Sequence, residues 1–62
     1  MGNYTLVGVN GNAFAIIGYV QNAMKKEGYP REDINKYIDK AQSGDYDNLL
    51  SVSIAQVDEL NE

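Results

Sequence analysis

The sequence has 62 residues and a formal net charge of -4, and it contains neither cysteine nor histidine. These values exclude disulfides and thiolate zinc sites, remove the commonest proton shuttle at neutral pH, and argue against direct binding to nucleic acid phosphates. A chain this short buries only about 60 % of the surface that its unfolded form exposes, so we expect one small domain over residues 1–62 that gains stability from a partner chain.

Neither a membrane span nor a signal peptide is expected. The sequence has no apolar run of 18 residues and no basic segment ahead of an apolar core. We therefore expect a cytoplasmic protein that does not contact a membrane.

Charge is distributed unevenly along the chain. Residues 1–24 contain no Asp, Glu, Lys or Arg, residues 25–40 contain all five basic residues, and residues 45–62 contain five acids and no base. An uncharged segment suits a protein core, and it also suits the centre of an interface, because interface centres are depleted in charge. Both interpretations stay open for the first 24 residues.

The first predicted element is a β-strand over residues 4–9, a short run rich in β-branched and aromatic side chains. A lone strand cannot satisfy its backbone groups, so its partner must be the C-terminal segment, a hairpin arm or the same strand of another subunit. We favour pairing between subunits, which predicts a homodimer or a higher oligomer.

The next segment is predicted to be a helix over residues 13–27. Its apolar residues recur at helical spacing, Asn12 is a suitable N-cap, and Gly28 suits the position after the C-cap. The preceding Asn-Gly pair is a strong hairpin signal, however, so a hairpin arm over residues 12–20 remains the alternative.

Two further helices are predicted, over residues 31–42 and residues 46–60. The first has apolar residues at i, i+3, i+4 and i+7. The second has an apolar helical face that continues to its end, although residues 49–57 also alternate as a strand would. The predicted fold class is mainly α, in the order β-α-α-α.

A candidate ligand site lies in the turn before the first predicted helix. Glycine and asparagine in a turn expose backbone N–H groups, and a helix N-terminus adds partial positive charge, so together they can hold an anion such as a nucleotide. No basic residue lies within twelve residues, so backbone dipoles or a partner's side chain would supply the attraction. The alternative is a turn and a helix cap without a ligand. The predicted ligand-binding residues are Asn10, Gly11, Asn12, Ala13 and Phe14.

A candidate interface between subunits lies in the same uncharged part of the chain. Tyrosine is enriched at interfaces, and the apolar residues of the predicted strand would lie beside a two-fold axis. Each of these residues equally suits the core or its edge. The predicted interface residues are Tyr4, Leu6, Val7, Ile16 and Tyr19.

Catalysis and metal binding have little support. The serines lack a histidine base, the lysines lie in a charged stretch, and the acids cluster in a tail instead of an apolar pocket. The segment that begins at Asp45 resembles the start of a calcium loop but lacks the later ligands. We expect no enzyme activity, no metal site and no cofactor.

Two blocks of sequence carry a resemblance to known proteins. Gly11-Asn12-Ala13-Phe14 and Ser43-Gly44-Asp45-Tyr46, with much of the chain between them, resemble a group of small proteins encoded in bacterial phages and prophages. The resemblance implies an accessory gene of a mobile element, in the cytosol of the host cell. Products of such genes often bind and block or sequester host factors. No catalytic residue or cofactor follows from the resemblance.

Two functions follow from these patterns. The first is a non-enzymatic, homo-oligomeric binding protein that counteracts a host system by sequestering an anionic small ligand such as a nucleotide signal. The alternative is an acidic inhibitor that mimics nucleic acid and blocks a host nucleic-acid-binding protein. The acids that would act as phosphate mimics are Asp45, Asp47, Asp58, Glu59 and Glu62. A structural component without a ligand is the third possibility.

Overall fold

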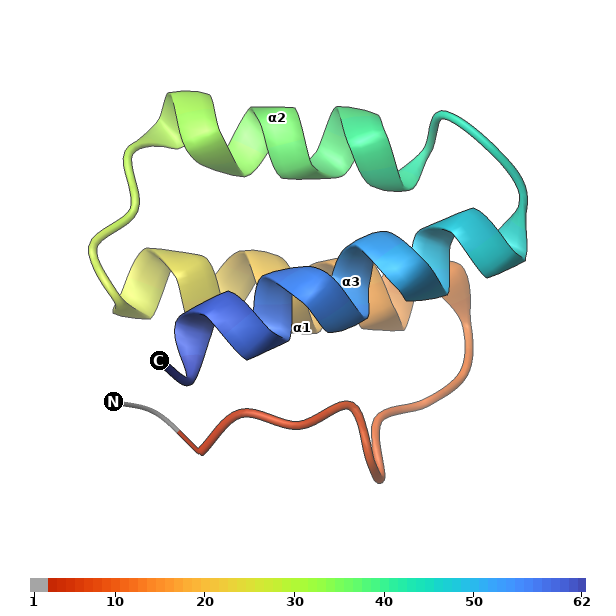
Figure 1. Cartoon of the computed structure of the whole chain (residues 1–62), viewed down its shortest axis with the longest axis horizontal. Helices are drawn as coiled ribbons and strands as arrows, with labels where there is room; N and C mark the ends of the chain where they lie inside the picture. The colour runs from red at the N-terminus through yellow and green to blue at the C-terminus, as the bar shows by residue number, and fades with distance from the viewer. Residues whose placement is uncertain (1–2) are drawn as a thin grey trace.

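The computed structural model describes residues 3–62, which form three α-helices and no strand (Figure 1). Helix α1 covers Ala13–Lys26, α2 covers Arg31–Ala41 and α3 covers Tyr46–Leu60. Helices α1 and α3 begin at the same end of the molecule, and α2 runs back between them in the chain (Figure 1). Each helix packs against both others, so the mainly α class holds.

The helix ends follow from local chemistry. The Asn12 side chain caps α1 by accepting a hydrogen bond from the backbone N–H of Phe14 (2.8 Å). Asp45 caps α3 in the same way through the N–H of Asn48 (2.9 Å). The chain leaves α1 through Gly28, whose φ of 84° suits glycine. Residues 12–20 are therefore not a hairpin arm, and residues 49–57 are helix, not strand.

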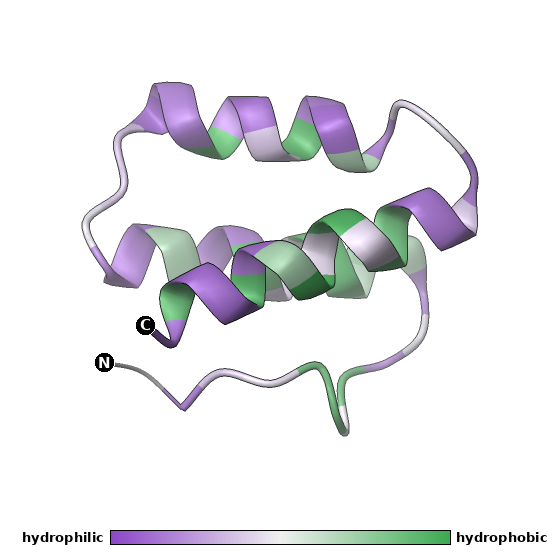
Figure 2. Cartoon of the chain, viewed as in Figure 1, coloured by the Kyte–Doolittle hydropathy of each residue, from purple (hydrophilic) through white to green (hydrophobic). Residues whose placement is uncertain are grey.

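The core lies where the three helices face one another, and the outer surface of α2 is largely hydrophilic (Figure 2). The buried Ser53 side chain shares a hydrogen bond with the Tyr37 hydroxyl (2.7 Å). No buried polar side-chain atom lacks a partner within residues 3–62. The buried apolar residues are Ile16, Ile17, Val20, Ala23, Met24, Ile34, Tyr37, Ala41, Leu49, Val57 and Leu60.

The strand predicted over residues 4–9 is wrong. Residues 3–12, which we call the arm, run irregularly along the bundle, in the opposite direction to α3 (Figure 1). The side-chain amide of Asn61 accepts a hydrogen bond from the Tyr4 N–H (2.9 Å) and donates one to the Tyr4 carbonyl (2.8 Å). At Tyr4 this amide takes the place of the neighbouring strand that a lone strand would need.

The remainder of the arm is also bonded within the same chain. The Tyr19 hydroxyl accepts a hydrogen bond from the Thr5 N–H (3.0 Å), and the Thr5 hydroxyl accepts one from the Val7 N–H (3.1 Å). A turn then closes through the Val9 N–H and the Leu6 carbonyl (3.1 Å). Backbone N–H groups on both edges of the arm are therefore already hydrogen-bonded within the chain. A regular ladder of hydrogen bonds to a neighbouring strand cannot form along it.

None of the three helices is long and apolar enough to cross a membrane.

Candidate functional site

The structure places the predicted ligand loop at the start of α1, where its polar groups bond to one another. The Asn10 side chain accepts from the Asn12 N–H (2.9 Å), and the Asn12 side chain accepts from the N–H of Phe14. The Gly11 carbonyl accepts a hydrogen bond from the Tyr46 hydroxyl. Phe14 projects from the first turn with 80 % of its surface exposed. The loop thus forms a turn and a cap, and no basic side chain contributes to it.

The predicted interface residues occupy three different environments. Ile16 is only 3 % exposed and belongs to the core between the helices. Tyr4, Leu6 and Tyr19 are half-buried and pack against that core. Val7 projects from the turn of the arm with 86 % of its surface exposed.

A hollow of about 510 Å³ lies between the arm and the second half of α1. We call it the arm hollow. Its walls combine two tyrosine rings with two lysines, and none of its lining residues is acidic. It is lined by Tyr4, Tyr19, Asn22, Ala23, Lys25 and Lys26.

Hydrogen bonds fix both rings of the arm hollow. The Tyr4 hydroxyl donates to Glu27 (2.7 Å), and this bond, with some burial and the charge of Glu27, raises the pKa of Tyr4. The Tyr19 hydroxyl accepts from the arm backbone, as described above. Within residues 3–62 the one ion pair joins Lys36 and Glu32 (3.8 Å), so the ammonium groups of the arm hollow are not engaged in one.

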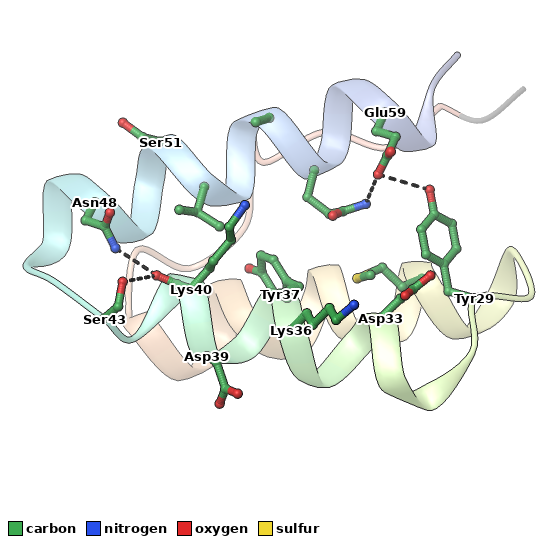
Figure 3. A pocket seen from close by; sticks show the side chains of 14 residues that line it. Tyr29, Asp33, Lys36, Tyr37, Asp39, Lys40, Ser43, Asn48, Ser51 and Glu59 are labelled. Atoms are coloured by element: carbon green, nitrogen blue, oxygen red, sulfur yellow. Dashed lines mark hydrogen bonds between the residues drawn. The ribbon is translucent and has the colours of Figure 1, made fainter.

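A larger hollow of about 940 Å³ lies along the contact between α2 and α3 (Figure 3). We call it the α2–α3 groove. Met24, Tyr37, Val52 and Ala55 give it apolar surface. Its remaining lining residues are polar or charged: Tyr29, Asp33, Lys36, Asp39, Lys40, Ser43, Asn48, Ser51, Gln56 and Glu59.

Hydrogen bonds hold polar groups at both ends of the α2–α3 groove (Figure 3). At one end the Asn48 amide donates to the Lys40 carbonyl (2.9 Å), which fixes the start of α3 beside the end of α2. At the other end Glu59 accepts hydrogen bonds from Gln56 (2.8 Å) and from the Tyr29 hydroxyl (3.4 Å) (Figure 3). Partial burial, together with the charge of Glu59, raises the pKa of Tyr29.

Two acids of the predicted phosphate-mimic set are hydrogen-bonded within the chain. Asp45 is engaged as the cap of α3, and Glu59 accepts the two hydrogen bonds of the groove. Within residues 3–62 no group of three or more acidic, histidine or cysteine side chains is placed to hold a metal ion.

Neither hollow was predicted from the sequence. A signal for the arm hollow was present, since Tyr19, Asn22 and Lys26 follow helical spacing on one face of α1. Its other wall comes from Tyr4, which reaches this face only because the arm folds back onto Asn61. No local pattern encodes that long-range contact.

Residues 3–62 thus form a small helical bundle in which α2 runs antiparallel to α1 and α3, and the arm packs against this bundle. Comparison of the chain with family models, with curated proteins and with solved structures found no match.

Proposed function

We propose that this protein is a non-enzymatic binding module that captures a small anion with a planar ring, such as a nucleotide, in the arm hollow. The supporting observation is that two tyrosines and two lysines line the same hollow. They are Tyr4, Tyr19, Lys25 and Lys26. In the mobile-element context that the sequence suggests, capture would remove a nucleotide signal from the host.

Charge favours the arm hollow over the α2–α3 groove for this ligand. The arm hollow is lined by two lysines and no acid, whereas the groove is lined by two lysines and three acids. Glu27 stands next to the Tyr4 hydroxyl and offsets part of the positive charge. An anion therefore meets net attraction in the arm hollow and net repulsion in the groove.

The residue types match the two parts of a nucleotide. Aromatic rings provide stacking surface for a base, which is worth about 1–3 kcal/mol per base in proteins that bind single strands. The lysine ammonium groups provide charge for a phosphate, and the Asn22 amide offers both a donor and an acceptor. The cavity volume of about 510 Å³ lies within the range of roughly 300–1,000 Å³ that is typical of small-molecule sites.

Isothermal titration calorimetry with adenosine monophosphate at low salt tests the proposal. Adenosine and ribose 5-phosphate serve as partial probes that separate the contribution of the ring from that of the phosphate. We expect the double variant Lys25→Ala/Lys26→Ala to bind adenosine monophosphate at least about tenfold more weakly, because about 1.4 kcal/mol corresponds to a factor of ten. The matched control Lys36→Ala/Lys40→Ala removes the same charge from the α2–α3 groove and should bind as the natural chain does.

A further variant separates the arm hollow from the loop at residues 10–14. Asn12→Asp retains a helix cap but adds a negative charge to the loop. The proposal expects unchanged binding by Asn12→Asp. Loss of binding in that variant, with full binding by the Lys25/Lys26 variant, would place the site in the loop and overturn the present assignment.

The inhibitor that mimics nucleic acid has weaker support. Two of its five acids are already bonded within the chain, and no observation identifies a common face for the others.

A further inference from the structure

We propose that Asn10 and Gly11 form a self-modification site, at which the folded chain converts Asn10 into aspartate or isoaspartate without an enzyme. The isoaspartate product then loosens the joint between the arm and α1. This inference concerns a covalent change in the loop ahead of α1, and it does not depend on the proposed ligand.

The reaction is an intramolecular substitution followed by hydrolysis. A base from the solvent removes the proton of the Gly11 N–H, and this nitrogen attacks Cγ of the Asn10 side chain. The new N–Cγ bond closes a succinimide ring, the bond from Cγ to the side-chain nitrogen breaks, and that nitrogen takes up a proton and leaves as ammonia. Solvent water then opens the ring at Cγ to give aspartate, or at the backbone carbonyl of Asn10 to give isoaspartate. No oxidant or reductant is needed.

The first observation is that nothing shields the reacting groups. Asn10 and Gly11 are both exposed, in the last part of the arm and just ahead of α1 (Figure 1). Within residues 3–62, neither the Gly11 N–H nor the side-chain nitrogen of Asn10 makes a hydrogen bond. The attacking nitrogen and the leaving group are therefore both open to the solvent with which they must exchange protons.

The second observation is a hydrogen-bond donor placed at the carbonyl group that is attacked. The Asn12 N–H donates to Oδ1 of Asn10 (2.9 Å). Negative charge develops on this oxygen when the Gly11 nitrogen adds to Cγ, and a donor fixed at such an oxygen stabilises the transition state. The fold therefore exposes the reacting pair and also polarises its carbonyl group.

The third observation is the contrast with the other asparagines. Asn10 is the one asparagine in the sequence that a glycine follows, and a glycine leaves the attacking nitrogen unhindered because it has no Cβ. Asn22 and Asn35 lie inside helices, where the N–H of the next residue is held in the helical hydrogen-bond pattern. We therefore expect the reaction to be confined to Asn10.

The structural consequence follows from two hydrogen bonds at this joint. The Tyr46 hydroxyl donates to the Gly11 carbonyl, and the Asn12 N–H donates to the Asn10 side chain. Isoaspartate carries the chain through Cβ, which inserts an additional atom into the backbone and leaves the free carboxylate on Cα. The insertion displaces Gly11 and Asn12 relative to the rest of the arm, so both bonds should weaken and the start of α1 should separate from the start of α3.

Incubation of the intact folded chain at mildly alkaline pH over several weeks, followed by mass spectrometry of its peptides, tests the site. We expect the peptide that contains Asn10 to gain the mass that replacement of an NH2 group by an OH group produces. The rate should rise with pH, because the attacking nitrogen must lose its proton. An isoaspartyl methyltransferase should label the product at its free carboxylate, and the peptides that contain the other asparagines should stay unchanged.

Gly11→Ala is the matched variant. The φ of Gly11 is not positive, and outside the neighbouring residues a Cβ at this position would meet no atom closer than the Tyr46 hydroxyl oxygen, at an ordinary contact distance of 3.5 Å. The variant should therefore fold as the natural chain does. Its methyl group hinders the attacking nitrogen and should slow the conversion by about tenfold or more.

Anion exchange separates the modified chain by its added negative charge, so its melting temperature can be measured. The isoaspartate form should melt below the natural chain. Asn10→Asp has the same added charge, an unaltered backbone and an acceptor for the Asn12 N–H, and it should melt near the natural chain. Three results would each overturn the inference: an unmodified Asn10 in the folded chain while the chain unfolded in guanidinium chloride reacts, equal conversion of Gly11→Ala, or an isoaspartate form as stable as Asn10→Asp.

Discussion

Asn61 and Tyr4 show how two residues far apart in the sequence decide the course of residues 3–12. The Asn61 amide bonds both backbone polar groups of Tyr4, and both residues are half-buried. No second strand is needed at Tyr4, because the Asn61 side chain supplies the donor and the acceptor that a paired strand would provide.

Asn61→Ala is expected to release the arm at Tyr4. The loss of two partly buried hydrogen bonds should lower the free energy of unfolding by about 1–2 kcal/mol. Amide hydrogen exchange at Tyr4 and Thr5 should accelerate, while exchange in the middle of α2 should change only with global stability. Asn61→Asp retains an acceptor for the Tyr4 N–H but sets a carboxylate oxygen against the Tyr4 carbonyl at the C-terminus of α3, so it should not restore the stability of the natural chain. Unchanged exchange at Tyr4 in Asn61→Ala would contradict the assigned contact.

The buried pair Tyr37 and Ser53 offers a second test at this scale. Each hydroxyl is the other's partner at 2.7 Å, and both residues lie in the core. Removing one partner leaves a buried polar group unsatisfied, so Tyr37→Phe should cost about 1–3 kcal/mol. The double variant Tyr37→Phe/Ser53→Ala should cost less than the sum of the two single changes. Urea unfolding of all four chains measures the coupling, and additive costs would show that the hydrogen bond contributes nothing.

At the scale of single elements, the helices could be predicted and the arm could not. Apolar periodicity and the caps Asn12 and Asp45 are local signals, and they located three helices whose ends differ from the structure by a residue at most. The arm depends on Asn61 and Tyr19, which are 57 and 14 residues from their partners. The groove needs α2 and α3 together, so no single segment of the sequence shows it.

The cap of α1 gives a prediction at the scale of the element. Asn12→Ala should lower the free energy of unfolding by about 1 kcal/mol, because the Phe14 N–H loses its acceptor. Asn12→Asp should preserve stability, since aspartate caps as well as asparagine and its charge suits a helix N-terminus. Chemical denaturation compares the three chains. Equal stability of Asn12→Ala and the natural chain would mean that the cap is not formed in solution.

At the scale of the whole molecule, the tyrosines make folding sensitive to alkaline pH. Burial raises the pKa of Tyr37 above its usual value of 10.0, although the hydrogen bond with Ser53 opposes part of that rise. The folded state therefore holds the phenol proton more tightly than the unfolded state does. This contribution to stability is complete below pH 10 and is lost as the pH rises through the folded-state pKa.

The melting temperature between pH 8 and pH 11.5 tests this linkage. We expect a decline that begins near pH 10 and is shallower in Tyr37→Phe/Ser53→Ala, which has no phenol in the core. Identical pH profiles for the natural chain and this double variant would show that Tyr37 ionises equally easily in both states.

A titration of the ¹⁵N-labelled chain with adenosine monophosphate, followed by amide chemical shifts, tests most directly whether the arm hollow is a ligand site. A chain of 62 residues permits every shifted amide to be assigned. We predict saturable shifts at Tyr4, Tyr19, Asn22, Lys25 and Lys26, with little change in the loop at residues 10–14 or in the α2–α3 groove. Saturable shifts confined to the loop or to the groove, or the absence of saturable shifts at millimolar nucleotide, would contradict a ligand site in the arm hollow.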